Sequence, residues 1–437
     1  MGPDNVISQP GQPGQPDQPG QPDQPGQPDQ TGRSGKSDQA GHPDQTGQFG
    51  QAGRPGRAAL GRLLLEAGAM APDWAPTFAA VGRAAFLPEL MWAFDAGAQD
   101  VVAVDKAEDP DAWYAAADSD FPIVTQWDDG EHTGPAPGRV STSSSSMPSV
   151  VYALLRDLAV DEGMSVLDVG TGTGETAGAL THRCGDRKVT TVEVDPSVSR
   201  HAGARLDAAG WHPRVVVGDG AKGHAGNAPY DRVLATVGLR EVPGAWVEQT
   251  RPGGLIVAPW GTHYTHADAV VRLVVRNGTA SGRFARPVEF MKLRTQRLSL
   301  PPHGAYVPAG GGDGGADASV TGIAESEFIT PPYSALRFAL GLRVPNCVQV
   351  VADRRDGARA VWFYGLTDRS WACVVFRARA AEARVRQAGE RRLWDEVEAA
   401  YRWWVGHGRP DHTRFGLTVG PAGQRVWLDD PADCWAP

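Results

Sequence analysis

The chain has 437 residues, a formal net charge of −9 at pH 7 and a pI near 5.7. This charge balance argues against nucleic acid or an anionic membrane as the main partner. No segment approaches the ~20 apolar residues of a transmembrane helix, and the N-terminus lacks the basic and apolar regions of a signal peptide. The sequence therefore predicts a cytoplasmic protein, and its length suggests two or more domains.

Residues 8–57 are built from triplets such as Gly-Gln-Pro and Asp-Gln-Pro. A three-residue period suggests collagen, but aspartate replaces glycine in several repeats, and only glycine fits the axis of a collagen triple helix. With almost no apolar side chains, the segment cannot offset the entropy of ordering. We therefore predict a disordered, partly polyproline-like tail over residues 1–56, acting as an inert linker or, alternatively, as a docking tether.

The folded chain is expected to begin near Arg57. Apolar residues recur with helical spacing over 58–69 and 74–81, and 101–104 is a short strand candidate. These elements lead into a polar loop and then into a stretch rich in serine.

That stretch places Ser144, Ser145 and Ser146 directly before Met147 and Pro148. Proline suits the first turn of a helix, so we expect a helix to start there, with Ser146 or Met147 near its cap. On composition alone, the serines are either a simple cap and turn or part of a site.

The stretch 165–176, SVLDVGTGTGET, organises the rest of the chain. Its apolar run 166–169 predicts a buried strand, and 175–184 suits a helix. Between them, three glycines let the backbone turn sharply and approach a ligand, with N–H donors at the helix start. A second strand over 189–195 ends in carboxylates, which can hold a ribose diol.

Two ligand classes fit this glycine turn, a dinucleotide and S-adenosylmethionine. The dinucleotide fingerprint is G-x-G-x-x-G, whereas here the spacing is Gly170-x-Gly172-x-Gly174, with Glu175 in the place of the third dinucleotide glycine. A carboxylate repels phosphate but accepts hydrogen bonds from a cationic amino-acid tail, and Asp168 adds to this acidity. The pattern D-x-G-x-G-x-G resembles motif I of S-adenosylmethionine-dependent methyltransferases.

Helix and strand signals continue to alternate after this point. Helices are predicted over 198–209 and 246–250, and strands over 215–217, 231–236 and 255–259. Ligands bind outside the carboxyl ends of such parallel strands, so the acids that follow them belong at one edge of the sheet. The chain's four cysteines are too far apart for a C-x-x-C metal or redox site, so buried or free thiols and no metal are expected; they are Cys184, Cys347, Cys373 and Cys434.

The last third predicts a second unit. Residues 301–330 are rich in Gly, Pro and Ala and are expected to be a linker. Residues 331–437 combine strand candidates, an amphipathic helix over 393–404 and a final hairpin over 416–428. We expect an α+β domain that supplies substrate recognition, with most of its aromatic side chains in its core.

From about Arg83 to Leu293 the chain resembles the protein-L-isoaspartate O-methyltransferases. The carriers of this resemblance keep the family's order; they are Phe86-Leu87-Pro88, Phe121-Pro122-Ile123, Ser146-Met147-Pro148, 166–174, Glu193, the run VGDGAKG at 217–223, 228–231 and 255–259. The resemblance implies an α/β, Rossmann-like class I methyltransferase domain over 57–300. The disordered tail precedes this domain, and the C-terminal extension follows it.

The resemblance also implies roles for individual residues. The glycine turn would hold the methionine part of S-adenosylmethionine, Glu193 the ribose hydroxyls and Asp219 the adenine amino group. Ser146 matches the serine of the family's Ile-Ser-x-Pro segment, beside the substrate carboxylate, although Ser145 replaces the isoleucine here. Candidate catalytic residues are Ser146, Ser145 and Ser144; candidate cofactor residues are Asp168, Gly170, Thr171, Gly172, Gly174, Glu193, Val194, Gly218, Asp219, Gly220 and Thr236.

The implied activity is methyl transfer to a carboxylate of Asp or isoaspartate in a polypeptide. The stretch 403–410 and the ending at 426–428 resemble methyltransferases encoded beside ribosomally made, modified peptides in actinobacteria. We therefore favour a precursor peptide as partner, its methyl ester leading to aspartimide or isoaspartate. The alternatives are a general isoaspartate repair enzyme and a scaffold that binds S-adenosylmethionine and peptide without turnover.

Overall fold

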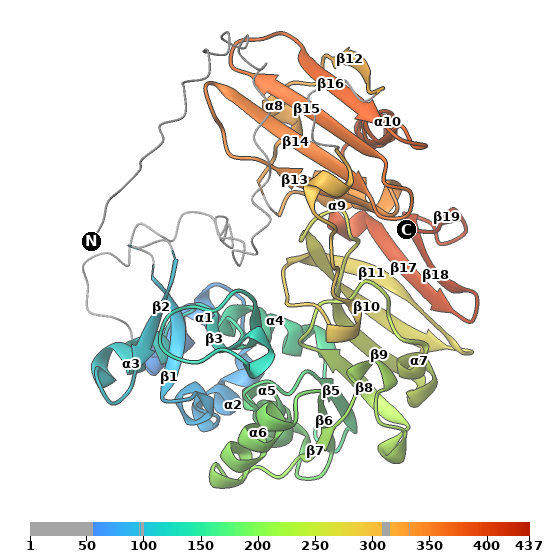
Figure 1. Ribbon diagram of the computed structural model, residues 1–437. Helices are drawn as coiled ribbons and strands as arrows, with labels where there is room; N and C mark the ends of the chain where they lie inside the picture. The colour runs from blue at the N-terminus through green and yellow to red at the C-terminus, as the bar shows by residue number, and fades with distance from the viewer. Residues whose placement is uncertain (1–55, 96, 98–99, 308–314, 332) are drawn as a thin grey trace, which may run out of the picture.

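A computed structural model describes residues 56–95, 97, 100–307, 315–331 and 333–437. The strands form sheets of four, ten and five strands (Figure 1). Apart from Gly56, the predicted N-terminal tail lies outside the described residues. None of the helices in this described part combines the length and apolar character that a membrane span requires.

The central sheet has the strand order β19-β18-β17-β11-β10-β9-β8-β5-β6-β7. Strands β5 to β9 pair in parallel, with β5 between β6 and β8, and the remaining pairs are antiparallel. A parallel sheet is covered on both faces, which explains the apolar runs that predicted these five strands. The bounds are β5 Val166–Val169, β6 Val189–Glu193, β7 Arg214–Val217, β8 Tyr230–Ala235, β9 Thr250–Trp260, β10 Asp268–Arg276, β11 Thr279–Val288, β17 Phe415–Gly420, β18 Gly423–Leu428 and β19 Cys434–Trp435.

Successive side chains of these strands alternate between two hydrophobic cores. Val166 and Val257 pack with helices α1, α4 and α5 on one face, whereas Leu167 and Ile256 pack with Trp246 of α7 on the other. All four aliphatic side chains are buried. The helices are α1 Arg57–Glu66, α2 Ala75–Ala80, α3 Pro110–Ala117, α4 Pro148–Leu158, α5 Glu175–Cys184, α6 Pro196–Ala208, α7 Gly244–Gln249, α8 Glu325–Phe328, α9 Ala335–Arg343 and α10 Leu393–Gly406.

An N-terminal sheet of order β2-β1-β3-β4 stands beside the glycine turn. The serine stretch forms its last strand, β4, which pairs antiparallel with β3. A run of serines carries little strand signal, which is why the sequence predicted no strand there. The helix expected at Pro148 is confirmed, with Met147 as its N-cap. The bounds are β1 Leu90–Asp95, β2 Asp100–Asp105, β3 Ile123–Trp127 and β4 Ser141–Ser145.

The third sheet, orange in Figure 1, has the order β12-β16-β15-β14-β13 and is antiparallel throughout. The predicted helix 393–404 is confirmed as α10, and its side chains Trp394, Val397 and Tyr401 are buried against this sheet. The bounds are β12 Asp317–Thr321, β13 Cys347–Val351, β14 Ala358–Gly365, β15 Trp371–Arg377 and β16 Ala383–Ala388.

The described parts of 301–330 differ from the expected linker. Strand β12 pairs with β16, and Phe328 lies in the core of the third sheet with only 1% of its surface exposed. His303 is also buried, with its Nδ1 atom 2.9 Å from the Tyr364 hydroxyl. The few apolar residues that anchor this segment are spaced among Gly, Pro and Ala, so no local period marks them.

The expected C-terminal domain 331–437 is shared between two sheets. Strands β17 to β19 extend the central sheet, because β17 pairs with β11 (Figure 1). Phe338 of α9 packs on Phe284 of β11 and on Phe415 of β17, with ring centroids 4.9 and 6.0 Å apart. The hairpin itself could be predicted from its local sequence. Its pairing with β11 could not, because that contact joins residues far apart in the sequence.

We expect the shared sheet to unfold as one unit. Leu417 of β17 is fully buried in the core that contains Leu167 and Ile256. Its replacement by alanine should cost about 2–5 kcal/mol of unfolding free energy. Chemical denaturation followed by cofactor binding and by tryptophan fluorescence should show one shared transition, shifted to lower denaturant.

The matched control is Leu298→Ala, because Leu298 is 40% exposed and should tolerate the change. If Leu417→Ala shifted a separate transition and left the transition reported by cofactor binding unmoved, the hairpin would not stabilise the central sheet.

Candidate functional site

The turn after β5 has a backbone conformation that favours glycine. Gly170, Gly172 and Gly174 have φ values of +97°, +53° and +95°. A Cβ atom on Gly170 would lie 2.8 Å from Cγ1 of Val237, so the turn is also too crowded for a side chain there. Thr236 donates a hydrogen bond to the carbonyl of Gly170 at 2.9 Å and fastens the end of β8 to the turn.

Asp168 lies at the bottom of this turn and is fully buried. Its Oδ2 atom accepts a hydrogen bond from Thr191 at 2.8 Å, and the Thr191 hydroxyl lies 2.7 Å from that of Thr171. Burial, together with the nearby charge of Glu193, raises the pKa of Asp168 to about 7, against the opposing effect of the hydrogen bond from Thr191. Its Oδ1 atom is buried without a hydrogen-bond partner among the described residues.

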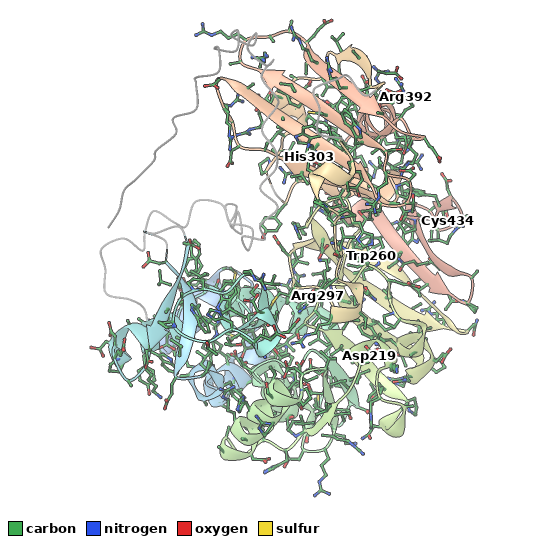
Figure 2. The ribbon with its side chains drawn as sticks, in the orientation of Figure 1. Asp219, Trp260, Arg297, His303, Arg392 and Cys434 are labelled. Atoms are coloured by element: carbon green, nitrogen blue, oxygen red, sulfur yellow. The ribbon has the colours of Figure 1, made fainter. Side chains whose placement is uncertain are left out.

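The other predicted acids lie at the ends of the next two strands. Glu193, at the end of β6, accepts hydrogen bonds from the backbone N–H groups of Gly172 and Asp195, at 3.0 and 3.1 Å. Asp219 follows β7 and accepts from Ala221 N–H at 2.9 Å (Figure 2). The structure thus brings the acids to one edge of the sheet, as predicted.

Small and apolar residues complete this edge. Val194 and Val217 are 38% and 54% exposed beside the two acids and provide an apolar surface. The Gly218 N–H donates to the Glu193 carbonyl at 2.8 Å, and a Cβ atom on Gly220 would lie 2.6 Å from Val169. This part of the edge suits a flat ring held between an apolar surface and carboxylates.

The predicted serines lie against the same turn. The carbonyl oxygen of Ser144 is 3.4 Å from where a Cβ atom on Gly172 would stand. Ser145 is buried, with its hydroxyl donating to Glu175 at 3.2 Å. The Ser146 side chain is partly exposed, and its hydroxyl makes no hydrogen bond to any residue that the structure describes. The Ser144 side chain is also partly exposed, and its hydroxyl likewise makes no hydrogen bond to a described residue, so Ser144 and Ser146, unlike Ser145, have hydroxyls that could serve a ligand.

Sequence reasoning missed a segment that crosses this edge after β11. Arg294 lies 3.2 Å from carboxylate oxygens of both Asp195 and Asp129. A Cβ atom on Gly220 would lie 3.2 Å from Cδ1 of Leu293. These contacts join residues far apart in the sequence, so they could not be predicted from local patterns. The glycine at position 220 was the one sequence feature that indicated a close approach there.

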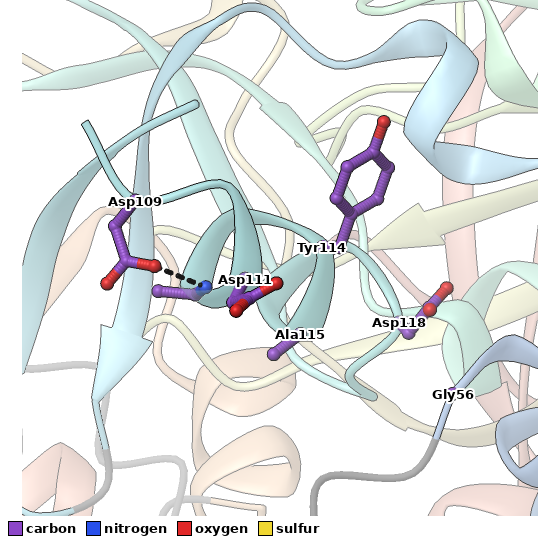
Figure 3. Close-up of a pocket in the computed structure, with 7 residues that line it drawn as sticks. Gly56, Asp109, Asp111, Tyr114, Ala115 and Asp118 are labelled. Carbon is purple, nitrogen blue, oxygen red and sulfur yellow. Dashed lines mark hydrogen bonds between the residues drawn. The ribbon is translucent and has the colours of Figure 1, made fainter. Parts of the chain in front are cut away.

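A separate hollow of about 540 Å³ lies at α3 (Figure 3). Its lining includes Asp109, Asp111, Tyr114 and Asp118, and none of the predicted site residues. The described cysteines are free thiols, and no cluster of His, Cys, Asp and Glu in the described ranges is arranged to hold a metal ion.

The glycine turn fits a cationic ligand better than a phosphate. Asp168, Glu175 and Glu193 surround it, and carboxylates repel the charge of a pyrophosphate. The buried, unpaired Oδ1 atom of Asp168 calls for a hydrogen-bond donor, such as the ammonium group of an amino-acid tail. The fold and the site together define a class I methyltransferase that uses S-adenosylmethionine.

The comparisons with known proteins place the chain in a family. A sequence model described as Protein-L-isoaspartate(D-aspartate) O-methyltransferase (PCMT) matches residues 132–297. The protein-L-isoaspartate O-methyltransferase of Thermococcus onnurineus is 34% identical over 175 residues, covering 40% of this chain and 78% of that relative. That of Methanococcus maripaludis is 36% identical over 146 residues, covering 33% and 68%. The chain belongs to the protein-L-isoaspartate O-methyltransferase family, which confirms the predicted enzyme class and methyl donor.

A solved structure of a protein-L-isoaspartate O-methyltransferase is also similar to the chain. It shares 20% sequence identity at a TM-score of 0.48, and the match covers 86% of this chain and 100% of that one.

The raised pKa of Asp168 predicts how cofactor affinity depends on pH. Below a pH of about 7 this carboxyl is protonated, and a neutral group attracts the cationic S-adenosylmethionine less than a carboxylate does. We expect the affinity to fall as the pH drops through about 7, and Asp168→Asn to weaken binding about 10-fold or more above that pH. Titration calorimetry at several pH values measures both effects.

Asp207→Ala is the matched control, since Asp207 is exposed on α6. Equal affinity of Asp168→Asn and wild type across the pH range would exclude Asp168 from the cofactor site.

Proposed function

We propose that the protein transfers the methyl group of S-adenosylmethionine to a carboxylate of an isoaspartyl or aspartyl residue in a polypeptide. The observation that carries this proposal is the placement of the Ser146 segment directly against the glycine turn. The relatives named above are isoaspartate O-methyltransferases, which supports an isoaspartyl acceptor. Glu193, Asp219 and the turn are the proposed cofactor residues.

Methyl transfer to a carboxylate requires the protein to align the carboxylate with the methyl group, and it requires no general base. A free carboxylate has a pKa of about 4, so it is already ionised near neutral pH and attacks without losing a proton. S-adenosylmethionine supplies an electrophilic methyl group when it is bound. The Ser146 hydroxyl orients one carboxylate oxygen toward that methyl, and the surrounding segments exclude water. The next backbone nitrogen then loses its proton and attacks the ester, so that methanol leaves and a succinimide forms. Water opens the succinimide to aspartate or isoaspartate.

Replacing Ser146 by alanine tests this assignment. Loss of one positioned donor near the reacting oxygen should lower the methylation rate about 10²–10³-fold while leaving S-adenosylmethionine affinity nearly unchanged. The measurement is mass-spectrometric detection of the methyl ester on an isoaspartyl peptide, together with calorimetry of the cofactor.

The control is Ser144→Ala, two residues earlier in the serine stretch and within β4. If Ser144→Ala abolished turnover and Ser146→Ala did not, the register assigned to the serine stretch would be wrong. A wild-type protein that binds the cofactor but methylates neither an isoaspartyl nor an aspartyl peptide would instead be a scaffold.

A second candidate function is the tailoring of one precursor peptide, and the charge of the C-terminal unit favours it. The family comparisons support a general isoaspartate methyltransferase more directly. However, residues 331–437 carry 16 arginines and 12 acidic residues, although the whole chain has a net charge of −9. A positively charged unit attached to an acidic enzyme is suited to hold an acidic segment of its substrate.

A hollow of about 440 Å³ lies between residues of this unit and the preceding segment 323–329, and four arginines and two glutamates are among the residues that line it. Glu325 pairs with Arg354 and lies 3.6 Å from Arg359. Arg377 and Arg379 also line the hollow, are exposed, and make no ion pair with any described residue. Guanidinium groups bind carboxylates through two parallel hydrogen bonds, so we propose that this hollow recognises an acidic stretch of the substrate.

Charge reversal tests this proposal. Arg377→Glu combined with Arg379→Glu should raise the KM about 10-fold for an isoaspartyl peptide extended by a flexible linker and a run of glutamates. The kcat should stay unchanged, as should both constants for the same peptide without the glutamates. Arg276→Glu with Arg425→Glu is the control, because it changes the charge equally at exposed positions outside the hollow.

If the glutamate run gave no advantage to the wild type, or if both double variants lost it equally, the hollow would not be a recognition site. The general isoaspartate methyltransferase would then be the better description.

A further inference from the structure

One buried guanidinium joins the segments that meet at the proposed site. Arg83 is fully buried in the 3-10 turn Arg83–Phe86. Its Nε atom donates to the Ser145 hydroxyl at 2.8 Å. Its other nitrogens donate to backbone carbonyls of Ser119 at 3.1 Å, Phe121 at 2.9 Å, Ser145 at 3.0 Å and Ser146 at 3.1 Å. A single side chain thus fixes both residues at the end of the serine stretch.

The Ser145 hydroxyl continues this chain of contacts to the glycine turn. It accepts from Arg83 and donates to Oε2 of Glu175, the residue that follows Gly174. The same carboxylate oxygen lies 3.8 Å from the Arg83 Nε atom. Burial raises the pKa of Glu175, and the nearby Arg83 opposes that shift. One hydroxyl therefore bridges a buried cation and a largely buried anion, and links β4 to the start of α5.

Fold stability alone is a weak explanation for this arrangement. The desolvation of a buried ion pair offsets most of its Coulomb attraction, so such pairs add little net stability. Here all the acceptors of Arg83 lie on two segments, and one of them carries the proposed Ser146. The five hydrogen bonds of Arg83 hold Ser145 and Ser146 in place, and the bond from Ser145 to Glu175 fixes their position relative to Gly174. These contacts therefore fix the distance between the Ser146 segment and the start of α5.

We propose that Arg83 and Ser145 are positioning residues for methyl transfer, holding the acceptor side of the site at a fixed distance from the cofactor side through Glu175. This inference rests on the proposed function. Neither residue touches the reacting atoms in this scheme. Ser145, which the sequence suggested as catalytic, instead sets the place of Ser146. A misplacement of about 1 Å can cost about 10²-fold in rate, so a broken link should appear in kcat.

The decisive variant is Ser145→Ala, which removes the bridging hydroxyl and leaves the backbone bonds of Arg83 in place. We expect kcat on an isoaspartyl peptide to fall about 10- to 100-fold, with the cofactor dissociation constant changed less than about 3-fold. Ser145→Thr, which restores a hydroxyl, should recover most of the rate. The matched control is Ser143→Ala on the same strand, because among the described residues its hydroxyl has one hydrogen-bond partner, Thr125, at 3.2 Å.

Three further variants keep the test independent of folding. Glu175→Gln retains an acceptor for the Ser145 hydroxyl, so it should lower kcat less than Ser145→Ala does. Combining Glu175→Ala with Ser145→Ala should cost little more than either change alone, because both break the same link. Arg83→Lys keeps the charge but cannot reach all the acceptors, and it should lower kcat at least as far as Ser145→Ala.

The outcomes separate the two claims. If the wild type methylates the peptide but Ser145→Ala matches Ser143→Ala in kcat, the positioning role is wrong. Additive effects of Ser145→Ala and Glu175→Ala would also overturn it. If the wild type binds S-adenosylmethionine and shows no turnover on any Asp or isoAsp peptide, the proposed function fails instead.

Discussion

The site depends on a backbone turn whose conformation favours glycine, pressed against the end of a polar strand. The positive φ angles at Gly170, Gly172 and Gly174 bring the backbone of the turn close to Ser144. A side chain at Gly170 would collide with Val237, and the turn would have to move away from the end of β8. The acids around the turn, Asp168, Glu175 and Glu193, favour a cationic ligand. The turn therefore determines where a ligand can approach the backbone, and the acids determine the charge that this ligand carries.

The elements around the turn could be predicted because their signals are local. The apolar run of β5, the glycines and the helix α5 follow one another within 166–184, and each signal is complete in a short window. The serine strand β4 could not be predicted, since serine favours turns and its pairing with β3 is set by the tertiary fold. The contacts of Arg83 reach residues 36 to 63 positions away, and nothing in the local sequence announces them.

The C-terminal unit shows the same limit at a larger scale. Its strands and α10 were visible as patterns, but the final hairpin belongs to the central sheet through β17 and β11. As a result, Phe338 and Phe415 belong to the same hydrophobic core as Val169 and Val192, which directly precede the glycine turn and Glu193. A substrate held by the C-terminal unit would therefore be held by a body continuous with the site, rather than by a tethered module. Remote binding of that kind can serve the reaction by placing an acceptor carboxylate without direct contact to it.

The most direct measurement of the central claim is a crystal structure of the protein with S-adenosylhomocysteine and an isoaspartyl peptide. The account predicts that the cofactor's amino-acid end lies on the Gly170–Gly174 turn and its ribose at Glu193. It further predicts that a carboxylate oxygen of the peptide lies between the cofactor sulfur and the Ser146 hydroxyl, within hydrogen-bond reach of that hydroxyl. A carboxylate bound away from Ser146, or a cofactor bound away from the turn, would contradict it.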